Sequence, residues 1–589
     1  HNWTFGASLE RYYSENVFFP GSQGIYVYNS LADFYTDAND YLANPNRTVS
    51  PVKLATFQKR WINIPGMKKP IQPLKVWYAG IYGQDEMQIN KNIRLTAGLR
   101  LDVPFFEKTG FDNVNADTTH FLDENGDVVQ YKTDKLPDAN IHFSPRFGFN
   151  WDVKGDRSTQ VRGGTGIFTG KPAYVWISNQ IGNTGMLTGF EKLTNTTARP
   201  FNPNPHAYEP ANVTGAPAAS YELALTDPNF KFPQIWRSNL GVDQKLPWGL
   251  IGTAEVLYGR DVNGIYYINA NLPKAQTNFN GADNRPRYTS NRINNTKGNV
   301  VENAIVLKNQ NVGYSYNIIA ALEKPFSNGF YGKVAYSYGI AKNTVDPGSI
   351  ASGSWTGNAI NWDPNNPVNA YSATSAGSRI IGALSYRFEY LKMGATTVAL
   401  FLDGFSVGNA SYIFSGDLNG DGATGNDLIY IHKDKSEMNF QEYKSGSVTF
   451  TAAQQADAWD AYIKQDKYLS KHRGEYAGRN AVRLPMVYRA DLSISQDLFT
   501  DFLGKRNTLQ FRVDFINFTN MINKNWGVSK KMVSNSPLVV PKTGAADSEG
   551  KATYTLRSFS GKLMDHTFDY NATLSDVYRV QFGLRYNFN

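Results

Sequence analysis

The clearest candidate for binding chemistry is an acidic, glycine-rich segment that runs from Asp417 to Asp427. It reads Asp-Leu-Asn-Gly-Asp-Gly-Ala-Thr-Gly-Asn-Asp, so oxygen-bearing side chains recur at every second position before a glycine. Asp417, Asn419, Asp421 and Gly422 thus match the first half of an EF-hand calcium loop, in which alternate oxygens converge on one cation. The pattern predicts a Ca²⁺ site with Asp417, Asn419, Asp421 and Asp427 as its ligands.

The match to a calcium loop is partial. Position twelve is Leu428 instead of a bidentate glutamate, and Asp427 stands one place early. The alternative is a turn in which the same Gly and Asx residues form local hydrogen bonds. A second segment, Asp123-Glu-Asn-Gly-Asp127, has the same alternation but carries Val128 where the glycine should be. We interpret this second segment as the tip of a hairpin in a loop.

Residue patterns that would support an enzyme or a nucleic-acid-binding protein are lacking. The chain has no Cys, and its seven His form no His-Glu-x-x-His arrangement. Arg162-Gly-Gly-Thr-Gly166 falls on an expected strand, so it is not a phosphate-binding loop before a helix. The net charge is +8, but 59 Lys and Arg are interspersed with 51 Asp and Glu, without a basic stripe. We therefore expect neither catalysis nor nucleic-acid binding.

A strand with two distinct faces ends the sequence. Apolar side chains occupy every second position, and polar side chains and one glycine occupy the positions between them; the apolar row is Tyr578, Val580, Phe582, Leu584, Tyr586 and Phe588. A period of two predicts a β-strand with one apolar and one polar face. Such a strand suits a transmembrane barrel if the apolar face meets lipid and the polar face meets a lumen.

The same alternation recurs along the whole chain. We count about fourteen segments with a period of two, beginning near residues 2, 75, 92, 141, 158, 235, 250, 312, 329, 379, 394, 486, 507 and 577. Long connections alternate strictly with short ones; the long ones cover roughly 11–74, 105–140, 169–234, 260–311, 340–378, 415–485 and 521–576. In a meander this alternation places all the long loops at one rim and all the short turns at the other. Outer-membrane barrels have this layout, with long loops outside the cell and short turns in the periplasm.

Overall composition agrees with a barrel that crosses the membrane by strands. The mean hydropathy is −0.43, and no apolar run approaches the ~20 residues of a spanning helix. Half of every barrel strand is polar, so a low hydropathy is expected. The fold class we predict is all-β, a transmembrane antiparallel up-and-down barrel. A large soluble all-β protein is the alternative. One helix is expected in a long loop, because Thr451-Ala-Ala-Gln454 is a capping box that opens a helix to about Leu469.

Charged side chains on the polar faces of these strands are expected to point into the lumen. They are Arg100, Asp102, Arg146, Arg489, Asp491, Arg512, Asp514 and Arg585. Three pairs among them stand two residues apart on one face. Charges buried in protein need partners, so we expect these side chains to bind other groups of the wall or of whatever fills the lumen.

Taken together, several motifs resemble one family. They are Tyr82-Gly-Gln-Asp-Glu86, Leu95-Thr-Ala-Gly-Leu-Arg-Leu-Asp102, Phe143-Ser-Pro-Arg-Phe-Gly-Phe-Asn-Trp151, Arg162-Gly-Gly-Thr-Gly-Ile-Phe168, Asn517-Phe-Thr-Asn520 and Phe582-Gly-Leu-Arg-Tyr-Asn-Phe588. In this order they resemble the C-terminal part of a TonB-dependent outer-membrane transporter. Phe18-Phe-Pro-Gly-Ser-Gln-Gly24, Tyr28-Asn-Ser-Leu-Ala-Asp-Phe34, Gly416-Asp-Leu-Asn-Gly-Asp-Gly422 and Arg473-Gly-Glu-Tyr476 are similar to the SusC/Oar-like kind found in Bacteroidota.

This resemblance implies a barrel of roughly 22 strands, of which residues 1–589 would supply about fourteen. The plug, the TonB-contacting box, the signal peptide and about eight strands are then expected outside this chain, because an open half-sheet would expose unpaired edges to lipid. The implied function is that of a receptor that binds a ligand at its extracellular loops and imports it through the plugged lumen. The implied partners are outer-membrane lipid, the TonB complex, the barrel-assembly machinery, and a surface lipoprotein or other outer-membrane proteins.

Two other functions stay open at this point. The first is a passive outer-membrane porin, and the second is a secreted β-rich binding protein or enzyme. The sequence does not identify the ligand, because loops vary freely on one fold. Peptides, glycans, siderophores and secreted proteins are all compatible with it.

The end of the last strand generates a first prediction. By resemblance, Phe582, Tyr586 and Phe588 form the signal that the barrel-assembly machinery reads, with the chain's C-terminus in the periplasm. Asn589 departs from a strictly terminal Phe. Deleting Phe588 should abolish assembly and leave synthesis intact, which quantitative blotting of outer-membrane and total fractions would measure. Normal surface levels of the deletion variant would overturn this assignment.

Overall fold

The computed structural model describes residues 1–390, 394–502 and 505–588. A single antiparallel sheet dominates it, in which each long strand pairs with the next long strand along the chain. In order these strands are β1 (Asn2–Asn16), β4 (Gln72–Gln88), β5 (Ile93–Phe106), β8 (His142–Asp152), β9 (Thr159–Thr169), β12 (Gln234–Leu246), β13 (Leu250–Asp261), β19 (Tyr314–Ser327), β20 (Phe330–Asn343), β22 (Gly377–Tyr390), β23 (Gly394–Ser406), β29 (Met486–Phe502), β30 (Lys505–Ile516) and β37 (Arg579–Asn587). The short β21 (Ala370–Tyr371) pairs with β20.

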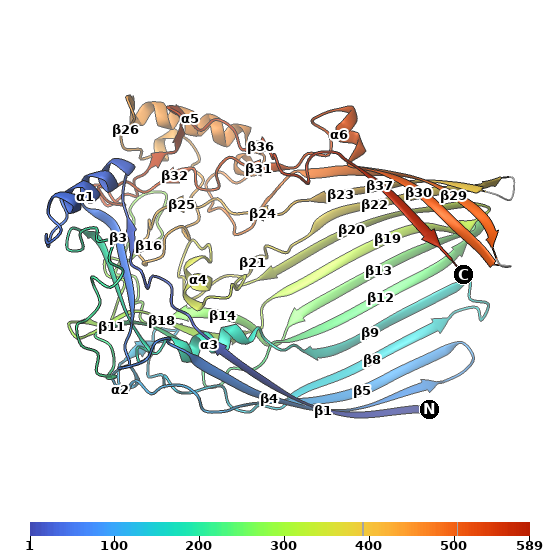
Figure 1. Cartoon of the computed structure of the whole chain (residues 1–589), viewed down its shortest axis with the longest axis horizontal. Coiled ribbons are helices and arrows are strands. Elements are labelled where there is room, and N and C mark those ends of the chain that lie inside the picture. The colour runs from blue at the N-terminus through green and yellow to red at the C-terminus, as the bar shows by residue number, and fades with distance from the viewer. Residues whose placement is uncertain (391–393, 503–504, 589) are drawn as a thin grey trace.

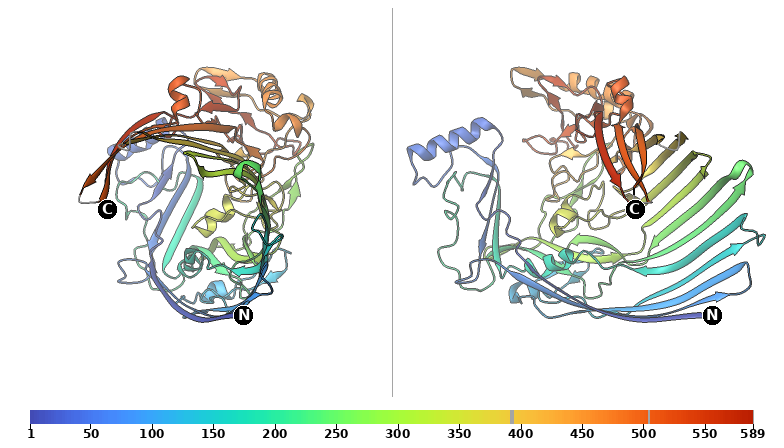
Figure 2. Two further views of the ribbon diagram at one scale, coloured as in Figure 1. Left: turned by 90° about the vertical axis from the view of Figure 1, so that its right-hand side faces the viewer. Right: turned by 45° about the vertical axis from the view of Figure 1, so that its right-hand side comes forward.

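Each of the fourteen predicted segments falls on one of these long strands and begins within three residues of its start. The sheet curves around a central space, with β1 and β37 at its two edges (Figure 2). The register is regular along both edge pairs, as in Phe5↔Gly83 and Val513↔Phe582. Among the described residues, no pairing joins β1 to β37.

Long and short connections alternate as predicted. The described short turns are 89–92, 153–158, 247–249 and 328–329, and they lie at one end of the sheet together with both chain termini (Figure 1). The alternation also predicts short turns near Lys392–Gly394 and Asp501–Asn507, and these fall partly outside the described residues. Asn589 lies outside them as well. The seven long connections lie at the opposite end; they are 17–71, 107–141, 170–233, 262–313, 344–376, 407–485 and 517–578. We call these seven segments together the loop crown.

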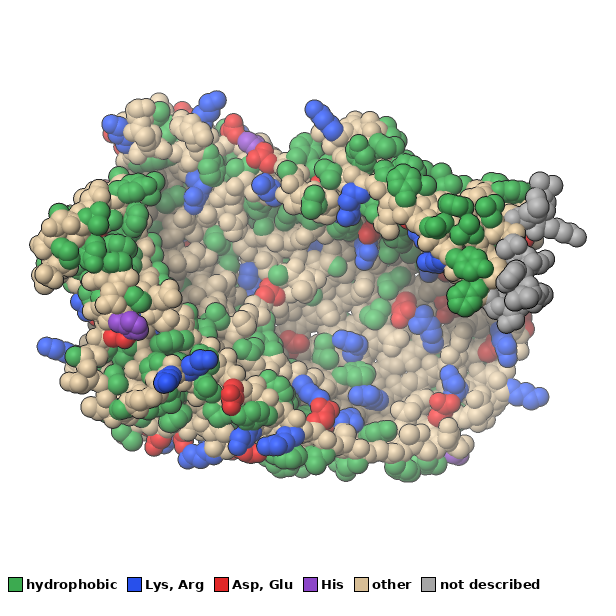
Figure 3. All heavy atoms as spheres, in the orientation of Figure 1, with side chains coloured by type: hydrophobic (Ala, Val, Ile, Leu, Met, Phe, Trp, Pro, Cys, Tyr) green, Lys and Arg blue, Asp and Glu red, His purple; other side chains and the backbone are tan. Residues whose placement is uncertain are grey.

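The two faces of the sheet differ in the way the alternation predicts. Large apolar side chains of many strands are exposed on one face, among them Phe5, Ile81, Leu99, Val334 and Leu584. An apolar surface of this extent is unfavourable in water and favourable in a bilayer. The opposite, hollowed side carries Lys, Arg, Asp and Glu side chains (Figure 3). Among the helices of the described residues, none combines the length and the apolar character needed to cross a membrane.

The loop crown is itself folded. Its helices are α1 (Leu31–Ala43), α2 (Val114–Asp117), α3 (Tyr174–Gly182), α4 (Ala351–Thr356), α5 (Ala452–Gln465) and α6 (Phe518–Ile522), with 3₁₀ turns at Lys435–Glu437 and Leu469–Lys471. Two small sheets contain its longest strands. One consists of β2 (Ile25–Val27), β3 (Leu54–Ile62) and β10 (Thr188–Thr196); the other contains β11 (Ser220–Thr226), β14 (Gly264–Asn269), β17 (Asn295–Thr296) and β18 (Asn299–Gln310).

Short two- and three-residue strands complete the crown. They are β6 (Phe121–Leu122), β7 (Val128–Val129), β15 (Thr277–Asn278), β16 (Pro286–Arg287), β24 (Asn409–Ala410), β25 (Phe414–Ser415), β26 (Tyr443–Ser445), β27 (Val448–Phe450), β28 (Val482–Arg483), β31 (Lys530–Met532), β32 (Leu538–Val539), β33 (Thr555–Leu556), β34 (Ser558–Phe559), β35 (Lys562–Leu563) and β36 (Phe568–Tyr570). β6 and β7 form a hairpin whose connection is Asp123–Asp127, so the second Asx-rich segment is the hairpin tip that we predicted.

Helix α5 shows how local sequence and packing stabilise the crown. Thr451 accepts a hydrogen bond from the backbone of Gln454, and the Gln454 side chain accepts one from the backbone of Thr451, so the predicted capping box is present. The helix ends at Gln465, four residues before the predicted end. Its apolar stripe, Trp459, Tyr462 and Ile463, is fully buried in a cluster with residues of the 407–485 and 517–578 loops.

A buried histidine joins these two loops. His432 Nδ1 accepts a hydrogen bond from Trp459 Nε1 at 3.1 Å, and its Nε2 contacts the Tyr554 hydroxyl. Burial lowers the pKa of His432 to about 4. The neutral imidazole is required, because a proton on Nδ1 would face the Trp459 N–H.

This histidine gives the crown a predictable pH dependence. The folded pKa lies below the ordinary value of about 6.5, so the unfolded state binds more protons between those two pH values. The contribution of neutral His432 to the free energy of unfolding is fully present above about pH 6.5 and should fall by roughly 3 kcal/mol as the pH drops to 4. Hydrogen exchange of α5 amides would measure the loss. In His432→Gln the fall in stability between about pH 6.5 and pH 4 should be smaller than in the wild type. The control His206→Gln, at an exposed site, should show the wild-type fall. An equal pH dependence of stability in all three proteins would contradict this role of His432.

Candidate functional site

A cavity with charged walls lies inside the loop crown and has a volume of about 740 Å³. Side chains from five long loops line it. One wall is formed by the same face of β3 and β10, through Arg60, Phe190 and neighbours at alternate positions; the other walls are formed by Glu222, Glu302 and Asn303, by α4 with Trp355, and by Asp417, Asp421, Gly422 and Thr424. We call this space the loop cavity.

Arg60 is the central side chain of the β3 wall. Its exposed fraction is 2%. The guanidinium forms an ion pair with Glu222 and lies 4.5 Å from the ring centre of Phe190. Glu222 is held in turn by Asn303 Nδ2 at 3.0 Å. Arg60 Nε has no hydrogen-bond partner among the described residues, so this buried cation keeps one donor for a ligand or a water.

The same cavity is lined by a second pair of opposite charges. Arg292 binds Glu302, and burial raises the pKa of Glu302 above its ordinary value. Asn303 Oδ1 is a buried acceptor without a partner among the described residues. The lining of the cavity therefore combines cations, carboxylates, an amide and aromatic rings. Its lining residues include no histidine, and the arrangement suits recognition of a polar ligand by hydrogen bonds and ring contacts.

The segment predicted to bind calcium forms part of this wall. Asp417 Oδ1 and Oδ2 accept hydrogen bonds from the backbone of Gly420 at 2.7 Å and Gly422 at 2.9 Å. Asp421 Oδ1 accepts one from Ala423 N at 2.7 Å. Asn419 and Asp421 are almost fully buried, at 2% and 1% exposure. The structure thus brings three of the four predicted ligands into one compact turn.

The fourth predicted ligand, Asp427, is engaged elsewhere. Its Oδ2 accepts hydrogen bonds from the backbone of Leu418 and Asn419, and its Oδ1 lies 3.3 Å from Arg285 Nη1. Arg285 is fully buried and also forms two hydrogen bonds with Asp283. Asp427 therefore closes the turn and anchors it to the 262–313 loop.

The carboxylates of this segment are buried and raise one another's pKa. Burial raises the pKa of Asp417 and of Asp421 to about 7, and the charge of neighbouring carboxylates adds to the rise. Burial likewise raises the pKa of Asp427, which Arg285 opposes. A cation among these oxygens would favour the ionised forms.

Another acidic group was missed by the sequence reasoning. Carboxylate oxygens of Asp112, Asp117 and Asp134 lie within 4.8 Å of one another in the 107–141 loop. Lys108 and Lys132 already form ion pairs with Asp134 and Asp117, so lysines neutralise much of this cluster.

The charged residues of the polar strand faces find partners in different ways. Arg100 binds Asp102 at 2.7 Å, and Arg512 binds Asp514 at 2.7 Å, each two residues along one strand. Arg489 and Asp491 diverge: Arg489 binds Asp576 at 2.9 Å, and Asp491 accepts a hydrogen bond from Asn517 N. Arg146 lies 4.6 Å from the ring centre of Phe168, and for Arg585 the described residues contain no ion-pair partner. These contacts are stabilising ones within the wall and between the wall and the 517–578 loop.

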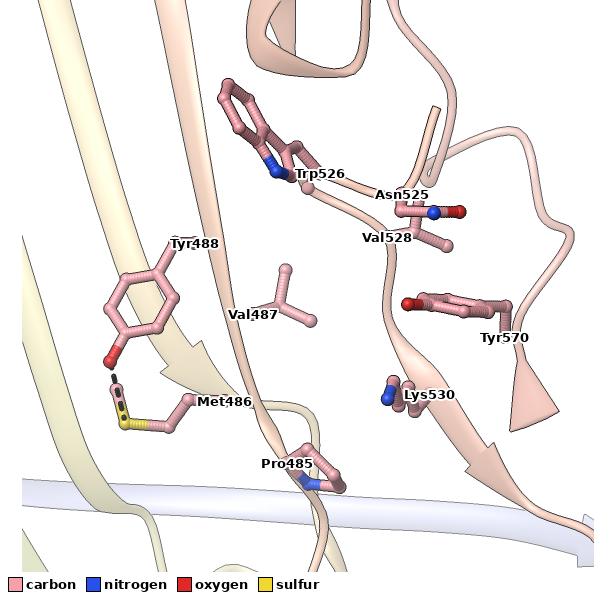
Figure 4. Close-up of a pocket in the computed structure, with 10 residues that line it drawn as sticks. Pro485, Met486, Val487, Tyr488, Asn525, Trp526, Val528, Lys530 and Tyr570 are labelled. Carbon is pink, nitrogen blue, oxygen red and sulfur yellow. Dashed lines mark hydrogen bonds between the residues drawn. The ribbon is translucent and has the colours of Figure 1, made fainter. Parts of the chain in front are cut away.

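A smaller pocket of about 240 Å³ lies where β29 meets this last loop (Figure 4). Met486 and Tyr488 lie on one side of β29, whereas Val487 points toward Lys530 and Tyr570 on the other. Tyr488 and Trp526 are each 51% exposed. The pocket is shallow and mostly apolar, and it lacks the paired charges of the loop cavity.

The sequence did not reveal the cavity lining, because its residues come from five loops that are distant along the chain. Among the aromatic residues of the 170–233 loop, Phe190 lines the cavity, whereas Phe230 and Phe232 are buried in an apolar cluster. One signal was present in the sequence: Thr56, Gln58 and Arg60 stand at every second position of β3, so they share one face of that strand, and this face lines the cavity.

Comparison with known proteins relates the chain to outer-membrane proteins. A family model described as an outer membrane beta barrel domain matches residues 1–545. No curated protein matches the chain significantly. Similar solved structures include the outer membrane transporter YddB from Escherichia coli (14% identity, 85% of this chain and 48% of that chain, TM-score 0.40). They also include the FrpB iron transporter (F5-1 variant) from Neisseria meningitidis (9%, 87% and 48%, TM-score 0.35) and the copper transporter OprC (9%, 78% and 47%, TM-score 0.34). The chain spans about half the length of these structures.

The buried ion pair of the cavity wall yields a stability prediction. Arg60→Ala leaves Glu222 buried without its cation, and this should lower the free energy of unfolding by roughly 3–5 kcal/mol. Hydrogen exchange of β3 and β10 should show that loss, and adding Glu222→Gln should recover part of it. As a matched control, Arg94→Ala removes an exposed pair with Glu86 (51% and 40% side-chain exposure) and should cost about 1 kcal/mol or less. Similar losses in the two single variants would contradict a structural role for the buried pair.

Proposed function

Because the chain belongs to the outer membrane beta barrel domain family, we propose that it forms the barrel portion of a receptor that imports a ligand across the outer membrane. The observation that carries this proposal is the loop cavity, a charged space built entirely from the long connections at one end of a membrane-spanning sheet. A binding site at that end would capture a ligand before it enters the barrel. Nothing in the lining requires a chemical change of the ligand.

The finer proposal is that the protein is a TonB-dependent transporter of the SusC/Oar-like kind. The motifs of the sequence support it, and so does the width of the curved sheet. A barrel this wide needs a plug in its lumen, and the charged inner wall offers polar groups for such a plug. The long loops would then be extracellular, and the short turns and the C-terminal end of β37 periplasmic.

We further propose that additional strands complete the barrel. The outer edges of β1 and β37 have no strand partner among the described residues. Unpaired backbone groups are unfavourable in lipid, so a closed barrel requires strands between these edges. The plug and the TonB-contacting box would accompany them. Barrel-assembly machinery, the TonB complex and a surface lipoprotein are the partners proposed with this architecture.

A conductance measurement separates the transporter from a passive porin. The intact protein, purified from outer membranes and inserted in a planar bilayer, should show no large, constitutively open channel, because the proposed plug closes the lumen. A wide, permanently open conductance would favour the porin and overturn the proposal. Stable solubility of the intact protein without detergent would instead favour a secreted binding protein or enzyme.

A further inference from the structure

We propose that the segment from Asp417 to Asn426 binds one Ca²⁺ in the wall of the loop cavity. The proposal concerns a resident ion and stands independently of transport. It departs from the sequence prediction in one ligand, because the structure replaces Asp427 by Asn426.

The observation that points to a ligand is an unpaired oxygen. Asn426 is fully buried, at 0% exposure. Its Nδ2 donates a hydrogen bond to Asp421 Oδ2 at 2.9 Å, which directs the amide into the acidic cluster. Its Oδ1 has no hydrogen-bond partner among the described residues. A buried acceptor without a partner is unfavourable. Turning the amide over exchanges its nitrogen and oxygen, so that Oδ1 would lie beside Asp421 Oδ2 and a cation there would bind both.

The donor set has the chemistry of a calcium site. Asp417 and Asp421 supply two carboxylates, whose charges balance one divalent cation. Asn419 and Asn426 supply neutral amide oxygens; an amide oxygen has two lone pairs, so the hydrogen bond that Asn419 Oδ1 accepts from Asp421 N leaves it able to bind a cation. Ca²⁺ prefers such all-oxygen sets and tolerates irregular geometry, whereas Mg²⁺ demands a near-ideal octahedron.

The backbone of the turn is shaped for this arrangement. Gly420 and Gly422 have φ of +83° and +92°, conformations that other residues rarely adopt. At Gly420, a Cβ atom would lie 2.2 Å from the carbonyl oxygen of Tyr288. The close approach lets Tyr288 N donate to the carbonyl of Asn419 at 2.7 Å. The turn is therefore packed tightly against the 262–313 loop.

A cation here would fix the cavity wall. The bond from Tyr288 N to the Asn419 carbonyl ties the turn to the 262–313 loop. The carbonyl of Asn426 accepts a hydrogen bond from Ile360 N at 2.7 Å, which ties the turn to the 344–376 loop. Asp417, Asp421 and Gly422 line the loop cavity directly. Ca²⁺ would thus join three long loops and hold the side of the cavity that they share.

The test uses the intact protein, purified from outer membranes in detergent and stripped with EGTA. Metal analysis after adding Ca²⁺ at roughly millimolar concentration should find one ion per chain that Asp417→Asn/Asp421→Asn loses. The melting temperature of the wild type should rise with Ca²⁺, since a ligand that binds only the folded state stabilises it. The matched control Asp123→Asn/Asp127→Asn, in the hairpin tip of similar sequence, should keep the wild-type response.

Two further measurements keep the proposal falsifiable if a variant is unstable. Each substitution replaces a carboxylate oxygen that accepts a hydrogen bond by an NH₂ donor, so Asp417→Asn/Asp421→Asn should melt lower than the wild type in EGTA. The measurement that decides is the rise in melting temperature from EGTA to Ca²⁺, which the variant should lack; a variant that keeps the wild-type rise would overturn the site. Asn426→Asp keeps an oxygen ligand and adds a charge, so it should bind Ca²⁺ at least as tightly. Absence of bound Ca²⁺ in the folded wild type, or an equal response to Mg²⁺, would also overturn the assignment.

Discussion

The rest of the structure depends on one constraint, which is that backbone N–H and C=O groups within a bilayer must pair with each other. Lipid offers them no hydrogen bonds, so only helices and closed sheets are stable there. The antiparallel pairing from β1 through β37 meets this constraint for the strands between these two edges. Pairing of this kind forces side chains to alternate between the two faces, so apolar side chains face outward while charges such as Arg100 and Asp102 lie on the inner face.

The loop crown is stabilised in a different way, by apolar cores that form in water. Its segments lie outside the bilayer, where the hydrophobic effect can form ordinary cores, and it has clusters such as that around Trp459, Tyr462 and Ile463. These cores give the long connections fixed positions. Buried polar contacts can then be held in defined geometry within them, and the pair of Arg60 with Glu222 is one example. A cavity with defined charged walls exists because the crown is folded and not because the barrel wall shapes it.

The part of the structure that could be predicted follows from local patterns. Period-two alternation located each long strand to within three residues, and the capping box at Thr451 located the start of α5. Both signals are contained in a few consecutive residues. The hairpin tip at Asp123–Asp127 was likewise readable from turn chemistry.

What could not be predicted depends on contacts between loops. The loop cavity joins β3, β10, β18 and α4, and no pattern within one segment indicates that Arg60 faces Glu222. The same limit applies to the acidic turn. The sequence selected Asp427 as a ligand from its spacing, but Arg285, more than a hundred residues earlier, draws that carboxylate away and leaves Asn426 with the free oxygen.

The orientation of the sheet in the outer membrane is the central claim, and surface labelling of intact cells tests it most directly. One epitope tag would be inserted in the 407–485 loop near the exposed Lys444, and another in the short turn 153–158. We predict that antibody labels the first tag on intact cells and reaches the second only after the outer membrane is permeabilised. Labelling of the short-turn tag on intact cells, with the loop tag protected, would contradict this orientation.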